Sequence, residues 1–306
     1  MKATRVIANG RVWTESGPRD ADVLIGEDGR VIRLIDRGEG ASAGVREGEG
    51  RGRSAVRPGA EGAEEPPERF DASGMWVLPG AIDVHVHFRE PGLTQKEDFL
   101  SGSQGAVLGG VTTVLDMPNT IPPVSDADRW IEKARLIEGR SYADYGLFTA
   151  AVAGEESPGE ETVDRLVRRV AGAVEAGAVA VKVFLGPTTG DIRAPGWGEL
   201  YALCRELAGR TVFVFHCEDR DVINAAARLK ASLDPADYAS LLAVRPRFGE
   251  IAATAGALRL ALTTGARVHI AHVALKEAVA DIRAVKEQGA PVTAETCPQY
   301  LFLSED

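Results

Sequence analysis

Two histidines in the sequence have the spacing that a metal site on a strand requires. His85 and His87 are separated by one residue within residues 80–92. On an extended strand, side chains two positions apart point to the same face. Neutral imidazole is a preferred zinc ligand, so this pair indicates half of a metal site. A pair of solvated strand histidines is the alternative for so short a motif.

A lysine with an unusual position on a predicted strand is the second candidate. Lys182 lies near the carboxyl end of residues 178–185, and it shares a face with Ala178 and Ala180. The opposite face carries valines suited to packing against helices. An unpaired ammonium among small residues is strongly penalised by desolvation. The position therefore indicates either a functional lysine or one that is paired with a carboxylate elsewhere in the chain.

The remaining histidines lie at the ends of two later strands. His216 falls near the end of the predicted strand 211–217, and His272 ends the predicted strand 266–272. His269 lies three positions before His272, so strand alternation predicts that it faces the helices as a packed or surface residue. We therefore expect His216 and His272, but not His269, to contribute to a site.

Strands and helices alternate from residue 75 onward. The predicted strands are residues 76–88, 111–115, 145–152, 178–185, 211–217, 266–272 and 291–296. Helices are predicted over 96–108 and 126–138, and a third has apolar residues at 163, 166, 167, 170 and 174 before Gly177. Strands that each lead towards a helix predict a parallel α/β barrel of the TIM type rather than an open sheet, although periodicity alone does not separate the two.

The first 70 residues differ from the rest. Residues 1–36 are predicted to form a small β accessory domain, with a hairpin turn at the Asn-Gly pair 9–10. Residues 37–70 are rich in Gly, Glu and Arg with little apolar bulk, which predicts a disordered loop. Residues 71–306 are then predicted to form a TIM-type (β/α)8 barrel from which strand 8 is missing.

Composition narrows the choice of partners and compartment. The net charge of −10 argues against nucleic acid and against an anionic membrane surface as partners. No apolar run is long enough to span a bilayer. The three cysteines are few, odd in number and without metal-ligand spacing, which favours a reducing, cytoplasmic location. We expect a small-molecule substrate, and a homo-oligomer is compatible with these features.

The order of the five candidate ligands along the chain resembles the binuclear metal site of the amidohydrolase superfamily. In that superfamily the strand-4 lysine is carboxylated, and the resulting carbamate bridges two divalent cations. The resemblance implies that His85 and His87 bind one ion, His216 and His272 bind the other, and carboxylated Lys182 bridges them. We expect the two ions to be zinc, which would acidify a water molecule for attack on an amide.

Two shorter motifs are similar to those of dihydroorotases. They are His-Phe-Arg-Glu-Pro-Gly at 87–92 and Met-Pro-Asn-Thr at 117–120. The resemblance implies that Arg89 and Asn119 hold the substrate carboxylate. It also implies the reversible hydrolysis of dihydroorotate to N-carbamoyl-L-aspartate, a step of pyrimidine biosynthesis.

Two departures from the dihydroorotase pattern leave alternatives open. Residues 295–301, Glu-Thr-Cys-Pro-Gln-Tyr-Leu, look more like hydantoinases and allantoinases. The family's strand-8 aspartate, a metal ligand and proton shuttle, has no counterpart in the 306 residues, so no catalytic acid or base is identified. We expect residues 1–306 alone to be inactive and to be a fragment of a longer enzyme. A non-catalytic dihydroorotase-like partner protein is the third hypothesis.

Overall fold

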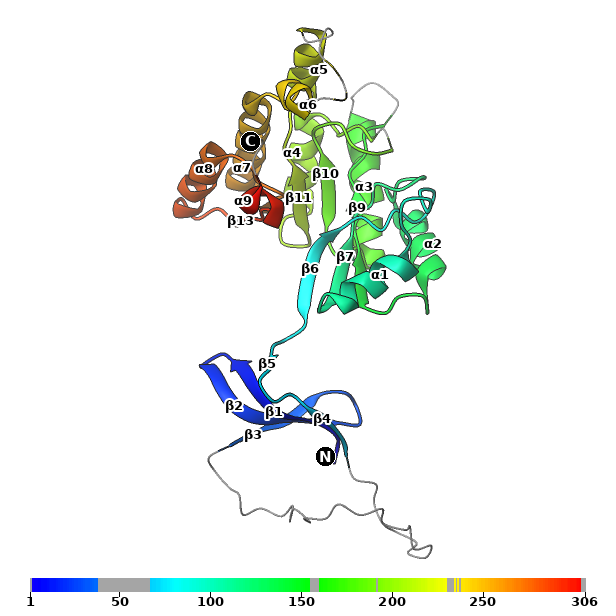
Figure 1. Ribbon diagram of the computed structural model, residues 1–306. Coiled ribbons are helices and arrows are strands. Elements are labelled where there is room, and N and C mark those ends of the chain that lie inside the picture. The colour runs from blue at the N-terminus through cyan, green and yellow to red at the C-terminus, as the bar shows by residue number, and fades with distance from the viewer. Residues whose placement is uncertain are drawn as a thin grey trace, which may run out of the picture. The chain divides into compact units, whose positions relative to one another are not determined.

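The computed structural model describes residues 2–37, 67–154, 160–190, 192–229, 234, 236 and 238–303. The chain divides into two compact units, Met1–Gly80 and Ala81–Asp306 (Figure 1). Most of the segment predicted to be disordered, residues 38–66, lies outside the described residues, so that prediction stays open.

The first unit is a small β-sheet. Its strands are β1 (Ala3–Thr14), β2 (Gly17–Gly26), β3 (Val31–Asp36), β4 (Glu68–Asp71) and β5 (Trp76–Val77). The order is β3-β2-β1-β4, and β5 also pairs with β1. Alternation along β1 and β2 buries Val12, Ala21 and Val23 together on one face.

The predicted hairpin at residues 9–10 is wrong, because β1 continues through this position. Asn9 has a φ of 63° and marks a bulge in the β1–β2 register, and its backbone N–H donates to Asp22 Oδ1 at 2.8 Å. The hairpin turn falls later, where Thr14 pairs with Gly17. An Asn-Gly pair supplies positive φ for a bulge as readily as for a turn, so the motif alone does not choose between them.

The boundary between the units differs from the prediction. Strands β4 and β5 both pair with β1, so residues up to Gly80 belong to the first unit and not to the barrel. The single strand predicted over 76–88 is therefore two strands, β5 and β6 (Ala81–Val86). Pro79 between them has no backbone N–H to donate, which ends the ladder at that point.

The second unit alternates parallel strands with helices, as predicted. Its strands are β6, β7 (Val111–Asp116), β8 (Asp144–Leu147), β9 (Thr149–Ala150), β10 (Val181–Phe184), β11 (Val212–His216), β12 (Arg267–Ile270) and β13 (Val292–Ala294). The helices are α1 (Phe99–Leu108), α2 (Ala127–Ile137), α3 (Glu160–Ala176), α4 (Trp197–Glu206), α5 (Arg220–Leu229), α6 (Tyr238–Ala243), α7 (Arg247–Thr264), α8 (Lys276–Glu287) and α9 (Pro298–Phe302).

These strands pair in sequence order. One sheet runs β6-β7-β8 and the other β9-β10-β11-β12-β13, and every pairing is parallel. Only Phe148 separates β8 from β9, so a single predicted strand pairs with β7 along its first part and with β10 along its second. Within this unit, the strands lie between helices α1 to α3 on one side and α7 and α8 on the other (Figure 1).

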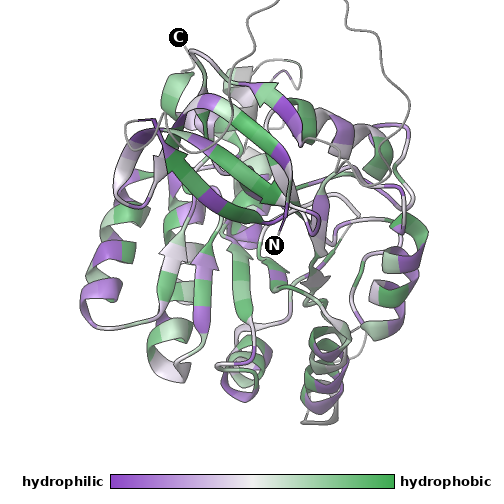
Figure 2. Cartoon of the chain, turned by 90° about the horizontal axis from the view of Figure 1, so that it is seen from below, coloured by the Kyte–Doolittle hydropathy of each residue, from purple (hydrophilic) through white to green (hydrophobic). Residues whose placement is uncertain are grey.

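Strand alternation separates two apolar layers. Val181, Val183, Phe213 and Phe215 pack outward with residues of α3, α4 and α7. The inward layer is smaller and holds Met117, Phe148, Ala180, Val214 and Ala271. The surrounding helices carry both hydrophobic and hydrophilic residues, as expected for helices with one face on a sheet (Figure 2). Side chains that share the parity of the inward layer therefore point into the barrel.

Candidate active site

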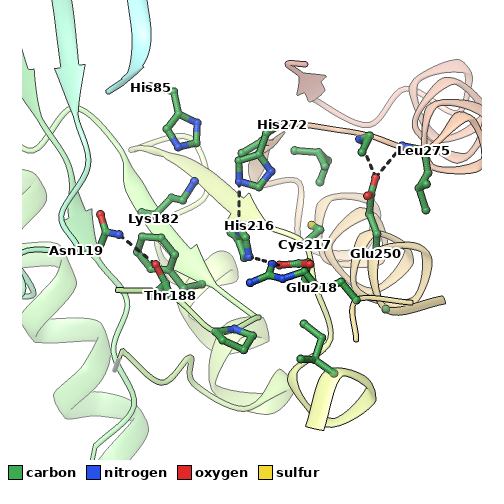
Figure 3. Close-up of a pocket in the computed structure, with 18 of the residues that line it drawn as sticks. His85, Asn119, Lys182, Thr188, His216, Cys217, Glu218, Glu250, His272 and Leu275 are labelled. Carbon is green, nitrogen blue, oxygen red and sulfur yellow. Dashed lines mark hydrogen bonds and ion pairs between the residues drawn. The ribbon is translucent and has the colours of Figure 1, made fainter. Parts of the chain in front are cut away.

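A cavity of about 980 Å³ opens where the strands of the second unit end. All seven residues predicted to bind metal or substrate line it: His85, His87, Arg89, Asn119, Lys182, His216 and His272. They come from five different strands or the residues that directly follow them, and several are labelled in Figure 3. The carboxyl ends of parallel strands meet at one edge of a barrel, which is why residues so distant in sequence converge.

The four predicted histidine ligands lie close together. The ring centroids of His85 and His87 are 5.3 Å apart, and those of His85 and His272 are 5.4 Å apart. His216 and His272 are closer, with centroids 4.7 Å apart and His216 Nδ1 2.9 Å from His272 Nε2. Two ring nitrogens that face one another in this way can also face a shared cation.

Burial keeps several of these imidazoles neutral. Desolvation lowers the pKa of His87 to about 3, and it also lowers the pKa of His85 and of His272. Neighbouring positive groups act in the same direction, with His85 lowering the pKa of His87 and His216 that of His272. A neutral imidazole retains the lone pair that a metal requires, so the electrostatics of the cavity favour ligation.

Lys182 lies inside the barrel with no exposed surface. Val181 and Val183 point outward, so Lys182 shares the inward parity of Ala180, as the sequence predicted. Among the described residues, its Nζ has no hydrogen-bond partner. Burial lowers the pKa of Lys182 to about 7, so a large part of the amine is neutral near that pH.

The donor set fits the metal pair that the resemblance implies. A buried amine without a partner is costly unless another group completes it, and conversion to a carbamate would supply two oxygen ligands between the histidine pairs. In the part of the chain that the structure describes, no three His, Cys, Asp or Glu side chains form a metal-binding group by themselves. The fit therefore depends on Lys182 as well as on the histidines.

Arg89 directly follows the paired histidines and lines the same cavity. It has a left-handed backbone with φ of 62°, an uncommon conformation for a residue with a side chain. Its Nη1 atom is buried and has no hydrogen-bond partner among the described residues. A guanidinium nitrogen in this state can donate to an anionic ligand.

Asn119 lines the cavity but is already hydrogen bonded at both ends of its amide. Its Oδ1 lies 2.8 Å from His87 Nδ1. Its Nδ2 donates to Thr188 Oγ1 at 3.1 Å, a contact drawn in Figure 3. An amide oxygen accepts a hydrogen bond from Nδ1–H, which leaves the lone pair on the His87 Nε2 atom. In this structure Asn119 therefore orients His87, a role that the sequence motif did not suggest.

The prediction for His269 is wrong. Val268 and Ile270 pack outward in the core with the helices, so His269 points to the opposite face, into the barrel. Its Nδ1 lies 2.8 Å from Thr293 Oγ1, and its Nε2 lies 3.3 Å from Glu295 Oε2. The error arose because alternation was counted back from His272, which lies beyond the end of β12 and has a φ of 38°.

Two carboxylates that the sequence analysis did not assign support the histidines. Glu295 contacts His85 Nδ1 as well as His269. Burial acts to raise the pKa of Glu295, but the contacts with His269 and His85 outweigh it and hold the pKa well below its usual range. Glu250 Oε1 accepts from the backbone N–H groups of Ala274 and Leu275, each at 3.1 Å, and so fixes the loop that follows His272 (Figure 3).

A buried ion pair holds the segment between His87 and Arg89. Asp116 and Lys133 are paired with side chains that are 0% and 1% exposed. Asp116 Oδ1 also accepts from the Phe88 backbone N–H at 2.7 Å. Because Phe88 lies directly between a predicted metal ligand and the predicted carboxylate-binding arginine, this pair positions both.

Comparison with known proteins agrees with this arrangement. The family model described as "Amidohydrolase family" matches residues 76–299. The chain belongs to this family. An allantoinase of Rubrobacter xylanophilus is 37% identical over 257 residues, covering 83% of this chain and 54% of the relative. A dihydroorotase of Methanothermobacter thermautotrophicus is 36% identical over 237 residues, covering 77% and 50%.

Solved structures show the same fold. The L-hydantoinase (dihydropyrimidinase) of Arthrobacter aurescens superposes with a TM-score of 0.81 at 26% sequence identity, covering 99% of this chain and 60% of that one. The predicted α/β fold of the TIM-barrel amidohydrolases is thus confirmed. This chain spans about half the length of the curated relatives it matches. None of its described helices is both long and apolar enough to cross a membrane.

Proposed function

We propose that the protein is a metal-dependent cyclic amidohydrolase that opens dihydroorotate reversibly to N-carbamoyl-L-aspartate. The observation that carries this proposal is the buried Nη1 of Arg89, which has no hydrogen-bond partner in the described part of the chain and lies beside the histidines of the cavity. Dihydroorotate carries a carboxylate on its ring, whereas allantoin and hydantoin are neutral rings. A buried guanidinium distinguishes these rings, because only the carboxylate of dihydroorotate forms a charge-assisted hydrogen bond with it. A neutral ring would leave the guanidinium desolvated and without that bond.

The residues of the cavity divide into metal-holding and substrate-holding groups. His85 and His87 would hold one divalent cation, His216 and His272 a second, and carboxylated Lys182 would lie between them. Such a pair, zinc in our proposal, would polarise the amide carbonyl and lower the pKa of water. The neutral amine of Lys182 forms the carbamate by attacking CO2, which makes the new N–C bond and releases one proton to solvent.

The other side chains orient the reactants. Arg89 grips the ring carboxylate, and the turn at Arg89 sets the direction of its side chain. Asn119 accepts from His87 Nδ1 and so keeps that imidazole turned towards the centre of the cavity. Holding the ring amide next to these groups replaces a bimolecular encounter by one between oriented partners.

An allantoinase or hydantoinase-type activity is the second candidate. Two observations favour it: the Glu-Thr-Cys-Pro-Gln-Tyr-Leu motif at 295–301, and similarity to an allantoinase and to a hydantoinase structure. These activities need the same metal site but no carboxylate receptor. They would leave the Arg89 guanidinium without a charged ligand.

A substrate panel tests the proposal. The protein, as encoded by its full gene, is loaded with zinc and assayed with dihydroorotate in both directions, with allantoin and with hydantoin. We expect the highest kcat/KM with dihydroorotate. Arg89→Met should lower it about 10- to 150-fold, because a charge-assisted hydrogen bond contributes roughly 1.5–3 kcal/mol. Arg210→Met, at a surface arginine paired with Glu175, is the control and should leave kcat/KM unchanged.

Other outcomes identify the alternatives. A higher kcat/KM with allantoin or hydantoin, with little effect of Arg89→Met, would refute dihydroorotase and support the second candidate. Failure to open any of the three rings, with the metal bound, would support a non-catalytic partner protein.

A further inference from the structure

A carboxylate that no sequence prediction assigned lies against one of the metal-site histidines. Glu218 Oε2 is 2.9 Å from His216 Nε2, while the other ring nitrogen of His216, Nδ1, is 2.9 Å from His272 Nε2 (Figure 3). The imidazole of His216 is therefore held at both ends. One end contacts an acceptor, and the other faces the second histidine of its pair.

The chemistry of these contacts fixes the position of the ring proton. An ionised carboxylate only accepts hydrogen bonds, so His216 Nε2 must carry the proton and Nδ1 must carry the lone pair. In this structure that lone pair accepts from His272 Nε2–H. We propose that Glu218 is a positioning residue that fixes the tautomer and orientation of His216, so that Nδ1 binds the cation shared with His272. This inference rests on the metal site of the proposed function.

Glu218 is itself held by a residue from another part of the barrel. Arg245 Nη1 donates to the same Oε2 atom that contacts His216. Arg245 lies between helices α6 and α7, and both it and Glu218 line the cavity. With two donors on one oxygen, the carboxylate has little freedom to turn away from the imidazole. Carboxylates in this position also raise the basicity of a metal-binding histidine, which strengthens ligation.

Gly186 lies directly against Glu218. A Cβ atom added to Gly186, just beyond strand β10, would lie 2.7 Å from Glu218 Cβ and 3.0 Å from the Glu218 carbonyl oxygen. It would also lie 3.2 Å from His216 Nε2. The first of these separations is closer than real Cβ atoms approach, and it involves an atom that cannot rotate away. Gly186→Ala therefore displaces the carboxylate from outside, without changing any polar group.

The experiment measures the affinity of the full protein for zinc by competition with a chromophoric chelator. The variants are Glu218→Ala, Glu218→Gln and Gly186→Ala. Glu277→Ala is the control, because Glu277 is a surface glutamate paired with Arg247. Loss of a carboxylate next to a metal-binding histidine typically weakens binding about 10–100-fold. We expect that loss for one of the two ions in Glu218→Ala and in Gly186→Ala, with the other ion retained.

The conservative variant separates positioning from charge. The amide oxygen of Glu218→Gln still accepts from Nε2–H. We therefore expect the zinc affinity of Glu218→Gln to lie within about fivefold of the wild-type value and to be higher than that of Glu218→Ala. The optical spectrum of the cobalt-loaded protein should change in Glu218→Ala and Gly186→Ala but not in Glu277→Ala. Melting curves confirm that each variant is folded.

Three outcomes would overturn the inference. Wild-type zinc affinity for both ions in Glu218→Ala would show that Glu218 does not position His216. An equal loss in Glu218→Gln and Glu218→Ala would show that its charge acts and not its acceptor oxygen. Absence of zinc from the wild-type protein would remove the metal site and with it both proposals. Two bound ions without turnover of dihydroorotate would contradict the proposed substrate alone and leave this inference standing.

Discussion

The substitution Asp116→Ala removes few atoms but should destabilise the barrel strongly, because the Asp116 side chain is paired and buried. The Asp116 and Lys133 side chains are 0% and 1% exposed. Lys133 Nζ also contacts the Met117 carbonyl oxygen at 3.5 Å and lies 5.6 Å from the centroid of the Phe99 ring. Asp116→Ala leaves this ammonium buried and unpaired, and it also removes the acceptor for the Phe88 N–H. Breaking a buried ion pair costs about 3–5 kcal/mol. For a unit of this size that loss lowers Tm by roughly 6–20 °C.

A double-mutant cycle tests the physical reason. In Asp116→Ala/Lys133→Met the buried charge is gone, and the main remaining loss is the unsatisfied Phe88 N–H, about 1–3 kcal/mol. The double variant should therefore be more stable than Asp116→Ala alone. Glu132→Ala provides the control, because Glu132 pairs with Arg129 on the exposed face of the same helix, and its Tm should change by less than about 2 °C.

Thermal unfolding followed by circular dichroism measures all four proteins of the cycle and the control. A Tm for Asp116→Ala within about 2 °C of the wild type would refute the energetic argument, because an exposed pair gives a shift of that size. Simple additivity of the two single variants would also refute it. In that case the two side chains would not act as a pair.

Three further predictions concern the same barrel. Lys182→Ala should lose bound metal and activity, with partial rescue by short carboxylic acids, and retention of two ions in this variant would contradict the carbamate. Burial lowers the pKa of Lys182 to about 7, whereas an unfolded lysine titrates near ~10.4. The unfolded chain then binds more protons between these values, so the metal-free protein should gain stability as pH rises from about 7 to about 10, and Lys182→Met should flatten this rise in Tm. Gly92→Ala should lower Tm by several degrees more than Gly110→Ala: both glycines have positive φ, but only the Cβ at Gly92 would meet a backbone atom, the Ile121 carbonyl oxygen at 2.1 Å. Equal Tm values for these two variants would contradict the steric argument.

Local patterns in the sequence predicted much of the barrel and its site. Alternation with a period of two placed Lys182 inside and its valine neighbours outside, because the pleat of a strand sends successive side chains to opposite faces. A sequence signal for Glu218 is its position two residues after His216, as His87 lies two positions after His85, but β11 ends at His216, so alternation alone does not place Glu218. The family resemblance added the ligand order, which spacing alone could not provide.

The tertiary structure decided the features that depend on where strands end and which of them are neighbours. His269 faces inward because β12 ends at Ile270, and the alternation counted from His272 does not extend across the left-handed turn. Glu295 meets His85 across 210 positions of the chain, a contact that only the curvature of the sheets brings about. Likewise, the Asn-Gly pair at 9–10 forms a bulge rather than a turn because β2 pairs with β1 on both sides of it. Local propensities do not distinguish between such conformations. The contacts between residues distant in sequence determine which conformation forms.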